Sequence, residues 1–215
     1  MSAPPHVRLV HGLGGTAATM APLAAALTAA GIACECITLP GHGTDPHDLE
    51  RIGWTEWLAA VTPAPVLVGQ SMGAALALAR ASLDHRVRAV VAVNMPAPDL
   101  DALDGLDRLR RQGHDRLDAP PLAEGELGYT HLPIAAAEEM VRGIASIDLG
   151  AVRAATLLVT GALDDVVDPY AAELVAAQLG GPVDRLVLAH SGHVATLGPD
   201  LDTLAAAVIA LATHT

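Results

Sequence analysis

The chain alternates short apolar segments with segments of helical periodicity. Six apolar runs recur, and several of them end at a glycine or a proline: Val7–Val10, Ile32–Leu39, Val66–Val68, Val87–Val93, Leu157–Thr160 and Leu186–Leu188. Segments with helical spacing of apolar residues lie between these runs and after the last one. This order predicts βαβ units and a parallel sheet. Because several runs are apolar throughout, helices should cover both faces of that sheet.

The stretch from about Pro96 to Gly150 interrupts this order. It is rich in Asp, Arg, Pro and Gly and has no clear strand. The whole chain has 215 residues, 52% of them hydrophobic, which is enough for one core. We therefore expect a single domain over residues 1–215, with residues 96–150 as a cap inserted between two strands.

The charge of the chain restricts its partners. It has 24 acidic and 12 basic residues, a formal net charge of -12. Phosphate binding needs a basic surface, so we expect no nucleic-acid partner and no attraction to anionic membranes. The N-terminal segment Met1–Pro5 has no signal-peptide pattern, and the alanine-rich runs 21–30 and 205–212 are too short to span a bilayer. These features predict a cytoplasmic protein without stable membrane insertion; they do not indicate its oligomeric state.

Two cysteines lie two residues apart in the second apolar run. Side chains at this spacing lie on the same face of a strand, where neighbours rarely form a disulfide. We interpret Cys34 and Cys36 as small buried hydrophobic residues.

The segment Gly69–Gly73 reads Gly-Gln-Ser-Met-Gly. It follows the apolar run Val66–Val68 and precedes a helical segment, Ala74–Ala81. In a strand–turn–helix setting, G-x-S-x-G forms a sharp turn that exposes the serine hydroxyl, and its glycines relieve the crowding there. The helix that follows directs backbone N–H groups toward developing negative charge. The pattern predicts Ser71 as a nucleophile; the alternative is a tight turn with an incidental serine.

A serine nucleophile needs a histidine base and an acid that orients it. When the serine lies in such a strand–turn–helix segment of a parallel sheet, the chain order is Ser, acid, His. His193 comes just after the sixth apolar run and is the predicted base, while His190 directly ends that run and is the weaker candidate. Asp164 and Asp165 both follow the fifth run, where a carboxylate could orient the histidine. The spacing alone leaves both aspartates open.

The first apolar run leads into a glycine-rich segment, residues 11–15. Gly12 lets the main chain approach a substrate closely, and we expect the N–H groups of Leu13 and Met72 to form an oxyanion hole. Glycine-rich turns also bind nucleotides. However, Ala17 stands where the third glycine of G-x-G-x-x-G would be, and no acid ends the second run, at Leu39–Gly41. We expect no cofactor.

Histidines and aspartates also gather in the loop after the second run, at positions 42, 45, 47 and 48. Their spacing fits no common zinc pattern. We therefore expect no metal site.

Taken together, these segments resemble the α/β-hydrolase superfamily, and within it the bacterial carboxylesterases and monoacylglycerol-lipase-like enzymes. The matching segments are residues 11–15, Leu39–Thr44, Gly69–Gly73, Asp164 with Val166 and Val167, and Ser191–Leu197. The resemblance implies the α/β-hydrolase fold in a reduced form, with a six-stranded all-parallel sheet, because the chain begins at what would be the third strand. It favours Asp164 over Asp165, since family members place the acid three residues after the strand-ending glycine. It also places the loop of His42 near the rim of the site, so His42 is predicted to contact substrate, as is Gly12 in the glycine-rich segment.

The resemblance implies hydrolysis of short- to medium-chain carboxylic esters through an acyl-enzyme, with a small acyl compound as substrate. A short, polar cap argues against long triacylglycerols. The same three residues could instead cleave a thioester, an amide or a carbon–carbon bond of a diketone, because a fold does not fix a reaction. A non-catalytic binding module is the remaining alternative, although none of Ser71, Asp164 and His193 is missing.

Overall fold

The computed structural model describes residues 6–122 and 125–215. Its main sheet has six strands in the order β2-β1-β3-β4-β7-β8, and every neighbouring pair is parallel. The strands are β1 (His6–Val10), β2 (Ala33–Ile37), β3 (Val66–Gln70), β4 (Ala89–Val93), β7 (Ala155–Gly161) and β8 (Val183–Leu188). The predicted six-stranded all-parallel sheet is therefore confirmed.

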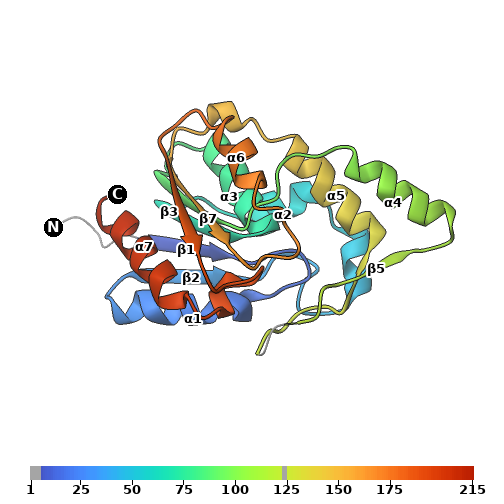
Figure 1. The fold of residues 1–215 in the computed structure, drawn as a ribbon, viewed down its shortest axis with the longest axis horizontal. Coiled ribbons are helices and arrows are strands. Elements are labelled where there is room, and N and C mark those ends of the chain that lie inside the picture. Colours follow the sequence, from blue (N-terminus) through green and yellow to red (C-terminus); the bar gives the residue numbers. More distant parts are fainter. Residues whose placement is uncertain (1–5, 123–124) are drawn as a thin grey trace.

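Helices cover both faces of this sheet, as predicted (Figure 1). Helices α1 (Ala17–Ala29) and α7 (Leu201–Thr213) pack on one face, and α2 (Trp54–Ala60), α3 (Met72–Leu83), α5 (Ile134–Ala145) and α6 (Ala171–Ala176) contribute to the core on the other. Successive residues of a strand point to opposite faces. In β3, Val66 and Val68 accordingly join the core with α1 and α7, whereas Leu67 joins the core with α3.

Burial along the strands explains the apolar runs. β3 and β4 lie inside the sheet and are buried at every position. β8 lies at an edge and carries exposed residues, among them Asp184 and Arg185. Cys34 and Cys36 lie on the other edge strand, β2, as free thiols packed against the core. They are half-buried and not buried as predicted, because an edge strand is covered less than a central one.

The segment between β4 and β7 has secondary structure of its own. It contains α4 (Ala102–Arg111), α5 and a two-stranded antiparallel pair, β5 (Arg116–Asp118) and β6 (His131–Pro133). Each of these strands has three residues, too few for a sequence pattern to reveal. α5 anchors the segment, since Ile134 and Ile144 are buried in it, whereas α4 has no buried residue. Below, residues 96–150 are called the insertion.

Three short 3-10 helices complete the described chain: η1 (Pro46–Arg51), η2 (Leu149–Ala151) and η3 (Ala195–Leu197). Within residues 6–122 and 125–215, no helix has both the length and the apolarity that crossing a bilayer requires.

Candidate active site

Ser71 occupies the sharp turn between β3 and α3. Its backbone has φ 54° and ψ -122°, a conformation that costs a residue with a Cβ about 1–3 kcal/mol. The turn is fixed by a hydrogen bond of 2.8 Å from the Ser71 N–H to the carbonyl of Val93. Both flanking glycines are required by close backbone contacts. A Cβ on Gly69 would lie 2.1 Å from the Gly73 oxygen, and one on Gly73 would lie 2.3 Å from the Val10 oxygen.

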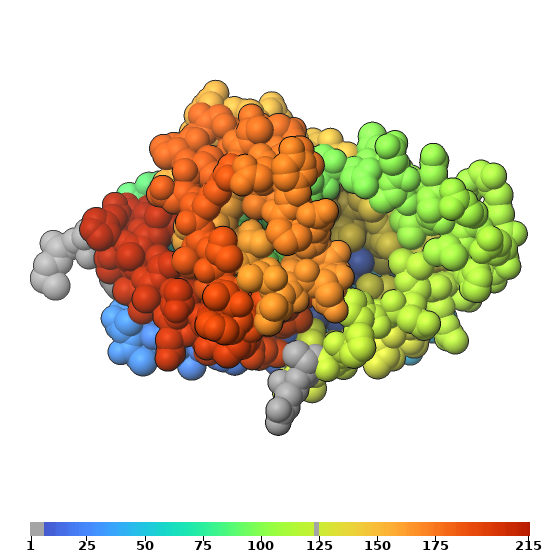
Figure 2. Space-filling view, viewed as in Figure 1, coloured from blue at the N-terminus to red at the C-terminus, as the bar shows by residue number. Residues whose placement is uncertain are grey.

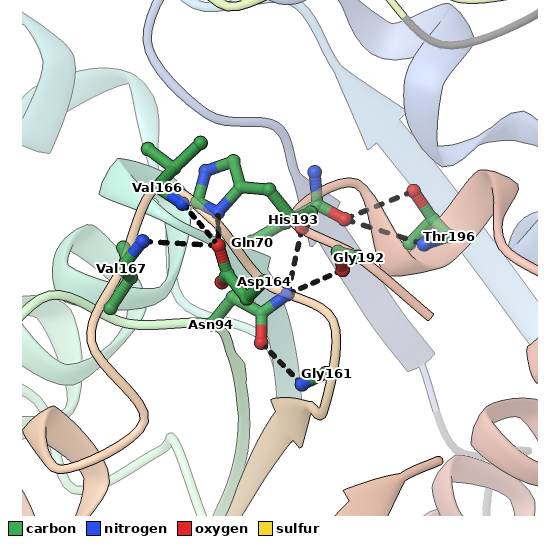
Figure 3. Close-up of polar contacts among 9 residues, drawn as sticks. All are labelled: Gln70, Asn94, Gly161, Asp164, Val166, Val167, Gly192, His193 and Thr196. Carbon is green, nitrogen blue, oxygen red and sulfur yellow. Dashed lines mark hydrogen bonds and ion pairs between the residues drawn. The ribbon is translucent and has the colours of Figure 1, made fainter. Parts of the chain in front are cut away.

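Asp164 holds the imidazole of His193. The Nδ1 of His193 lies 3.0 Å from Oδ2 and 3.1 Å from Oδ1 of Asp164 (Figure 3). The N–H groups of Val166 and Val167 donate to the same Oδ1, at 2.9 and 3.0 Å. Burial disfavours the charged carboxylate, but the hydrogen bonds from His193, Val167 and Val166 outweigh it, so the pKa of Asp164 lies below its usual value. Asp164 is thus an ionised group that fixes the orientation of the imidazole and accepts its Nδ1–H.

Neither of the two rival residues takes part in this pair. Asp165 is exposed and makes no hydrogen bond to His193 within the part of the chain that the structure describes. The ring of His190 is 76% exposed and contacts Asp200, with 3.1 Å between its Nδ1 and Oδ1 of Asp200. The geometry therefore pairs His193 with Asp164, while their catalytic roles remain predictions.

Asn94 is a residue that the sequence analysis missed. It directly follows β4, is 3% exposed and has a positive φ of 48°. Its Oδ1 accepts the Gly161 N–H at 2.7 Å, and its Nδ2 donates to the carbonyls of Gly192 at 3.0 Å and His193 at 2.7 Å (Figure 3). A single side chain therefore joins the end of β7, which leads into the Asp164 loop, to the loop that carries His193. The sequence signal that could have identified Asn94 is its position as a polar residue directly after a fully apolar strand.

A second buried contact holds the histidine loop to β3. Thr196 is fully buried, and its hydroxyl lies 2.7 Å from the Thr19 carbonyl and 3.2 Å from Oε1 of Gln70. The Thr196 N–H also donates to that Oε1, at 3.4 Å (Figure 3). Since Gln70 immediately precedes Ser71, this contact links the loop of His193 to the turn of Ser71.

The predicted oxyanion donors belong to two turns, Leu13 to the turn after β1 and Met72 to the turn after β3. Met72 is the first residue of α3, whose leading N–H groups have no acceptor within the helix. Leu13 lies in the turn after β1, where Gly12 packs so closely that a Cβ on it would be 3.2 Å from the Cβ of Ser71. Neither the Leu13 nor the Met72 N–H donates a hydrogen bond to any residue in 6–122 or 125–215. Both groups are thus free to bind a ligand oxygen, as an oxyanion hole requires.

His42 does not reach the substrate side of this site. It is 4% exposed, its Nδ1 lies 3.0 Å from the Pro40 carbonyl, and its ring stacks on Tyr129 with 6.3 Å between centroids. Tyr129, not His42, lines the cavity next to Ser71. The predicted substrate contact of His42 is therefore not found, because aromatic packing holds the ring behind the cavity wall.

His11 contacts both the glycine-rich turn after β1 and the loop after β2. Its ring lies 4.9 Å from that of His42, and its Nε2 accepts the Leu39 N–H at 3.0 Å. Its Nδ1 lies 2.7 Å from the Gly12 carbonyl, so the neutral tautomer with hydrogen on Nδ1 satisfies both contacts. Burial, with a contribution from His42, lowers the pKa of His11 to about 4, and burial also lowers the pKa of His42. Both rings are neutral at pH 7.

A cavity of about 450 Å³ opens beside Ser71; we call it the serine cavity. Ser71, His193 and Leu13 lie in its wall, and Asp165 contributes at the rim. The insertion supplies the opposite wall with residues that are mostly apolar: Ala119, Pro120, Pro121, Leu122, Glu126, Tyr129, Leu132 and Met140. Gly12 lines a smaller pocket that also includes Ser71 and His193. No group of three His, Cys, Asp or Glu side chains among the described residues forms a candidate metal site.

Comparisons with known proteins agree with the fold. Residues 9–207 match the family described as the alpha/beta hydrolase family. A thermostable monoacylglycerol lipase from Bacillus sp. (strain H-257) is 30% identical over 214 residues, covering 92% of this chain and 86% of that protein. A solved structure from work on the metagenome-derived lipolytic enzymes LipS and LipT is 25% identical, with a TM-score of 0.87, and covers 100% of this chain and 97% of that one. The monoacylglycerol lipase of Paleococcus ferrophilus, 18% identical with a TM-score of 0.75, covers 100% of this chain and 97% of its own and shares the fold.

Proposed function

Because the chain belongs to the alpha/beta hydrolase family, we propose that it hydrolyses carboxylic esters, with Ser71 as nucleophile, His193 as base and Asp164 as the orienting acid. The observation that carries this proposal is the Asp164–His193 pair, 3.0 Å apart, whose histidine lies in the wall of the cavity that also contains the strained Ser71. The proposed substrates are short- to medium-chain esters, and the similarity to a monoacylglycerol lipase suggests monoacylglycerols among them. In this proposal, residues 96–150 act as the cap of a single domain.

The proposed reaction has two steps. Ser71 Oγ attacks the ester carbonyl carbon while Nε2 of His193 takes the hydroxyl proton. The N–H groups of Leu13 and Met72 bind the oxyanion that forms. When the intermediate collapses, the bond to the alcohol oxygen breaks and His193 returns the proton to the leaving alcohol. Water then attacks the acyl-enzyme by the same route and releases the carboxylic acid and Ser71.

Asp164 contributes by keeping the imidazole in one tautomer. An ionised carboxylate that accepts the Nδ1–H leaves Nε2 unprotonated, so that Nε2 can accept the serine proton. Its depressed pKa supports this role, because the carboxylate stays charged well below neutral pH. When His193 becomes an imidazolium ion during each step, the same carboxylate stabilises the added charge.

Substitution of Ser71 tests the nucleophile. We expect Ser71→Ala to reduce hydrolysis of p-nitrophenyl acetate and butyrate by at least about three orders of magnitude. A fluorophosphonate probe should label the wild-type protein at Ser71 and leave the variant unlabelled. Wild-type turnover in the variant would refute the assignment, and failure to label Ser71 would favour a binding module. A parallel panel of an ester, a thioester and a diketone with the same acyl group tests the reaction class.

A further inference from the structure

A second cavity adjoins the serine cavity. It has a volume of about 540 Å³, and its walls come from residues 96–102 after β4, from α5 and from residues 166–174 after β7. We call it the distal cavity. Met140 and Val166 lie in the walls of both cavities and therefore form the partition between them. Figure 2 shows the surface hollowed between the insertion and the segment after β7.

The chemistry of the distal cavity favours a hydrocarbon. Its walls are apolar except for Asp99, Asp168 and the hydroxyl of Tyr170, and no cationic side chain among the described residues lines it. Three of its wall residues, Val166, Tyr170 and Leu174, are 45%, 62% and 43% exposed. Apolar side chains that are exposed together mark sites that a ligand or partner covers. A polar alcohol such as glycerol, or a free carboxylate, gains little binding free energy against such walls. An alkyl chain gains more, because binding there removes its apolar surface from water.

We propose that the distal cavity receives the methyl end of the substrate's acyl chain, and that Met140 and Val166 set the chain length needed to reach it. This proposal rests on the esterase function proposed above. The carbonyl of a bound ester lies at Ser71, so a short chain ends within the serine cavity and a longer one must pass the partition. Met140 suits that position because an unbranched thioether side chain adapts its shape readily. Each methylene that enters the distal cavity raises kcat/KM by up to about fourfold, the value for full burial of one CH₂ group.

The test compares p-nitrophenyl acetate, butyrate, octanoate and dodecanoate below their micelle concentrations. Ala102 lies in the wall of the distal cavity on the exposed helix α4, so Ala102→Trp fills the cavity without disturbing the core. We expect Ala102→Trp to lower the ratio of kcat/KM for dodecanoate to that for butyrate by at least about tenfold, the loss of roughly two buried methylenes. Met140→Trp should lower the ratio in the same direction. Ala206→Trp, at an exposed position of α7 outside both cavities, is the matched control and should keep the wild-type ratio.

A second series fixes the acyl group as acetyl and lengthens the alcohol from ethyl to dodecyl. If Ala102→Trp lowers kcat/KM along this series and not along the acyl series, the distal cavity binds the alcohol and the proposal is wrong. An unchanged acyl ratio in both Ala102→Trp and Met140→Trp also overturns it. Either result, together with hydrolysis that Ser71→Ala abolishes, refutes the distal subsite alone. Hydrolysis that survives Ser71→Ala refutes the proposed function instead.

Discussion

Replacing Asn94 tests whether the loops of Asp164 and His193 are held by one side chain. Asn94→Ala removes three hydrogen bonds and leaves the Gly161 N–H and the Gly192 and His193 carbonyls without this partner. At about 1 kcal/mol for each bond, the loss is about 3 kcal/mol of folding free energy. Alanine also tolerates the φ of 48° less well than asparagine, which adds about 1 kcal/mol. Urea denaturation of Asn94→Ala should therefore show a stability loss of about 4 kcal/mol, measured as the free energy of unfolding.

The same substitution should reduce turnover. Asn94 fixes the main chain of His193 and not the substrate, so its loss displaces the imidazole from Ser71 and leaves the cavity walls in place. A displacement of about 1 Å typically costs about 100-fold in rate. We expect kcat for p-nitrophenyl butyrate to fall by one to two orders of magnitude, with KM changed far less. Asn94→Asp should behave similarly: it keeps the acceptor for Gly161 but replaces the amide donor with an oxygen facing two carbonyls.

A control separates positioning from general destabilisation. Leu27 is fully buried near the C-terminal end of α1, and Leu27→Ala should lose a comparable 2–5 kcal/mol. Assayed at a temperature where each variant is folded, Leu27→Ala should retain the wild-type kcat. If Asn94→Ala also retains it, Asn94 does not position His193. If Asn94→Ala loses less than about 1 kcal/mol of stability, the energetic reasoning about the three bonds is wrong.

Three further predictions follow from the geometry of the site. Asp164→Asn should lower kcat by about three to four orders of magnitude, and a greater loss in Asp165→Asn would reassign the acid. His11 has a pKa of about 4 in the folded protein against 6.5 in the unfolded chain, so the unfolded chain binds more protons between these values. The free energy of unfolding, measured by urea titration, should therefore be greatest above pH 6.5 and fall by up to about 3 kcal/mol toward pH 4. If His11→Gln shows the same dependence of this free energy on pH, His11 is not its cause. Tyr129→Phe removes the hydroxyl that donates to Gly41 at 2.9 Å and accepts from Thr44 at 3.0 Å, and should cost about 1–2 kcal/mol in thermal unfolding; no measurable change would show that these bonds carry no net stability.

The residues that could be predicted from the sequence are those that follow directly on strand ends. Carboxyl ends of parallel strands lie along one edge of the sheet, so Ser71 after β3, Asp164 after β7 and His193 after β8 come close in space although they are far apart in the chain. The six parallel strands were predictable for the same reason: buried strands need apolar runs, and the runs are short enough to exclude helices.

The residues that escaped prediction depend on contacts between distant segments. Asn94 bonds to main-chain groups 67 to 99 positions away, which no local pattern records. His42 lies in a polar loop and therefore looked accessible, but Trp57, His11 and Tyr129 from three other segments enclose it. The rival acids Asp164 and Asp165 differ only in which one meets the N–H groups of Val166 and Val167, a difference set by the turn and not by residue type.

The attachment of the insertion explains why the two cavities should respond differently to change. Beside Ser71, the Tyr129 N–H donates to the Gly14 carbonyl at 2.8 Å, and the Thr16 hydroxyl donates to the Leu127 carbonyl at 3.2 Å. The wall nearest the ester is therefore bonded to the same turn that carries the proposed oxyanion donor Leu13. On the other side, α4 buries no residue and is joined to α5 by the Arg110–Glu138 ion pair at 3.2 Å, so few buried contacts hold the wall of the distal cavity that it provides. Substitutions in α4 should consequently alter the preferred acyl length, whereas substitutions around Tyr129 should alter the reaction at the ester itself.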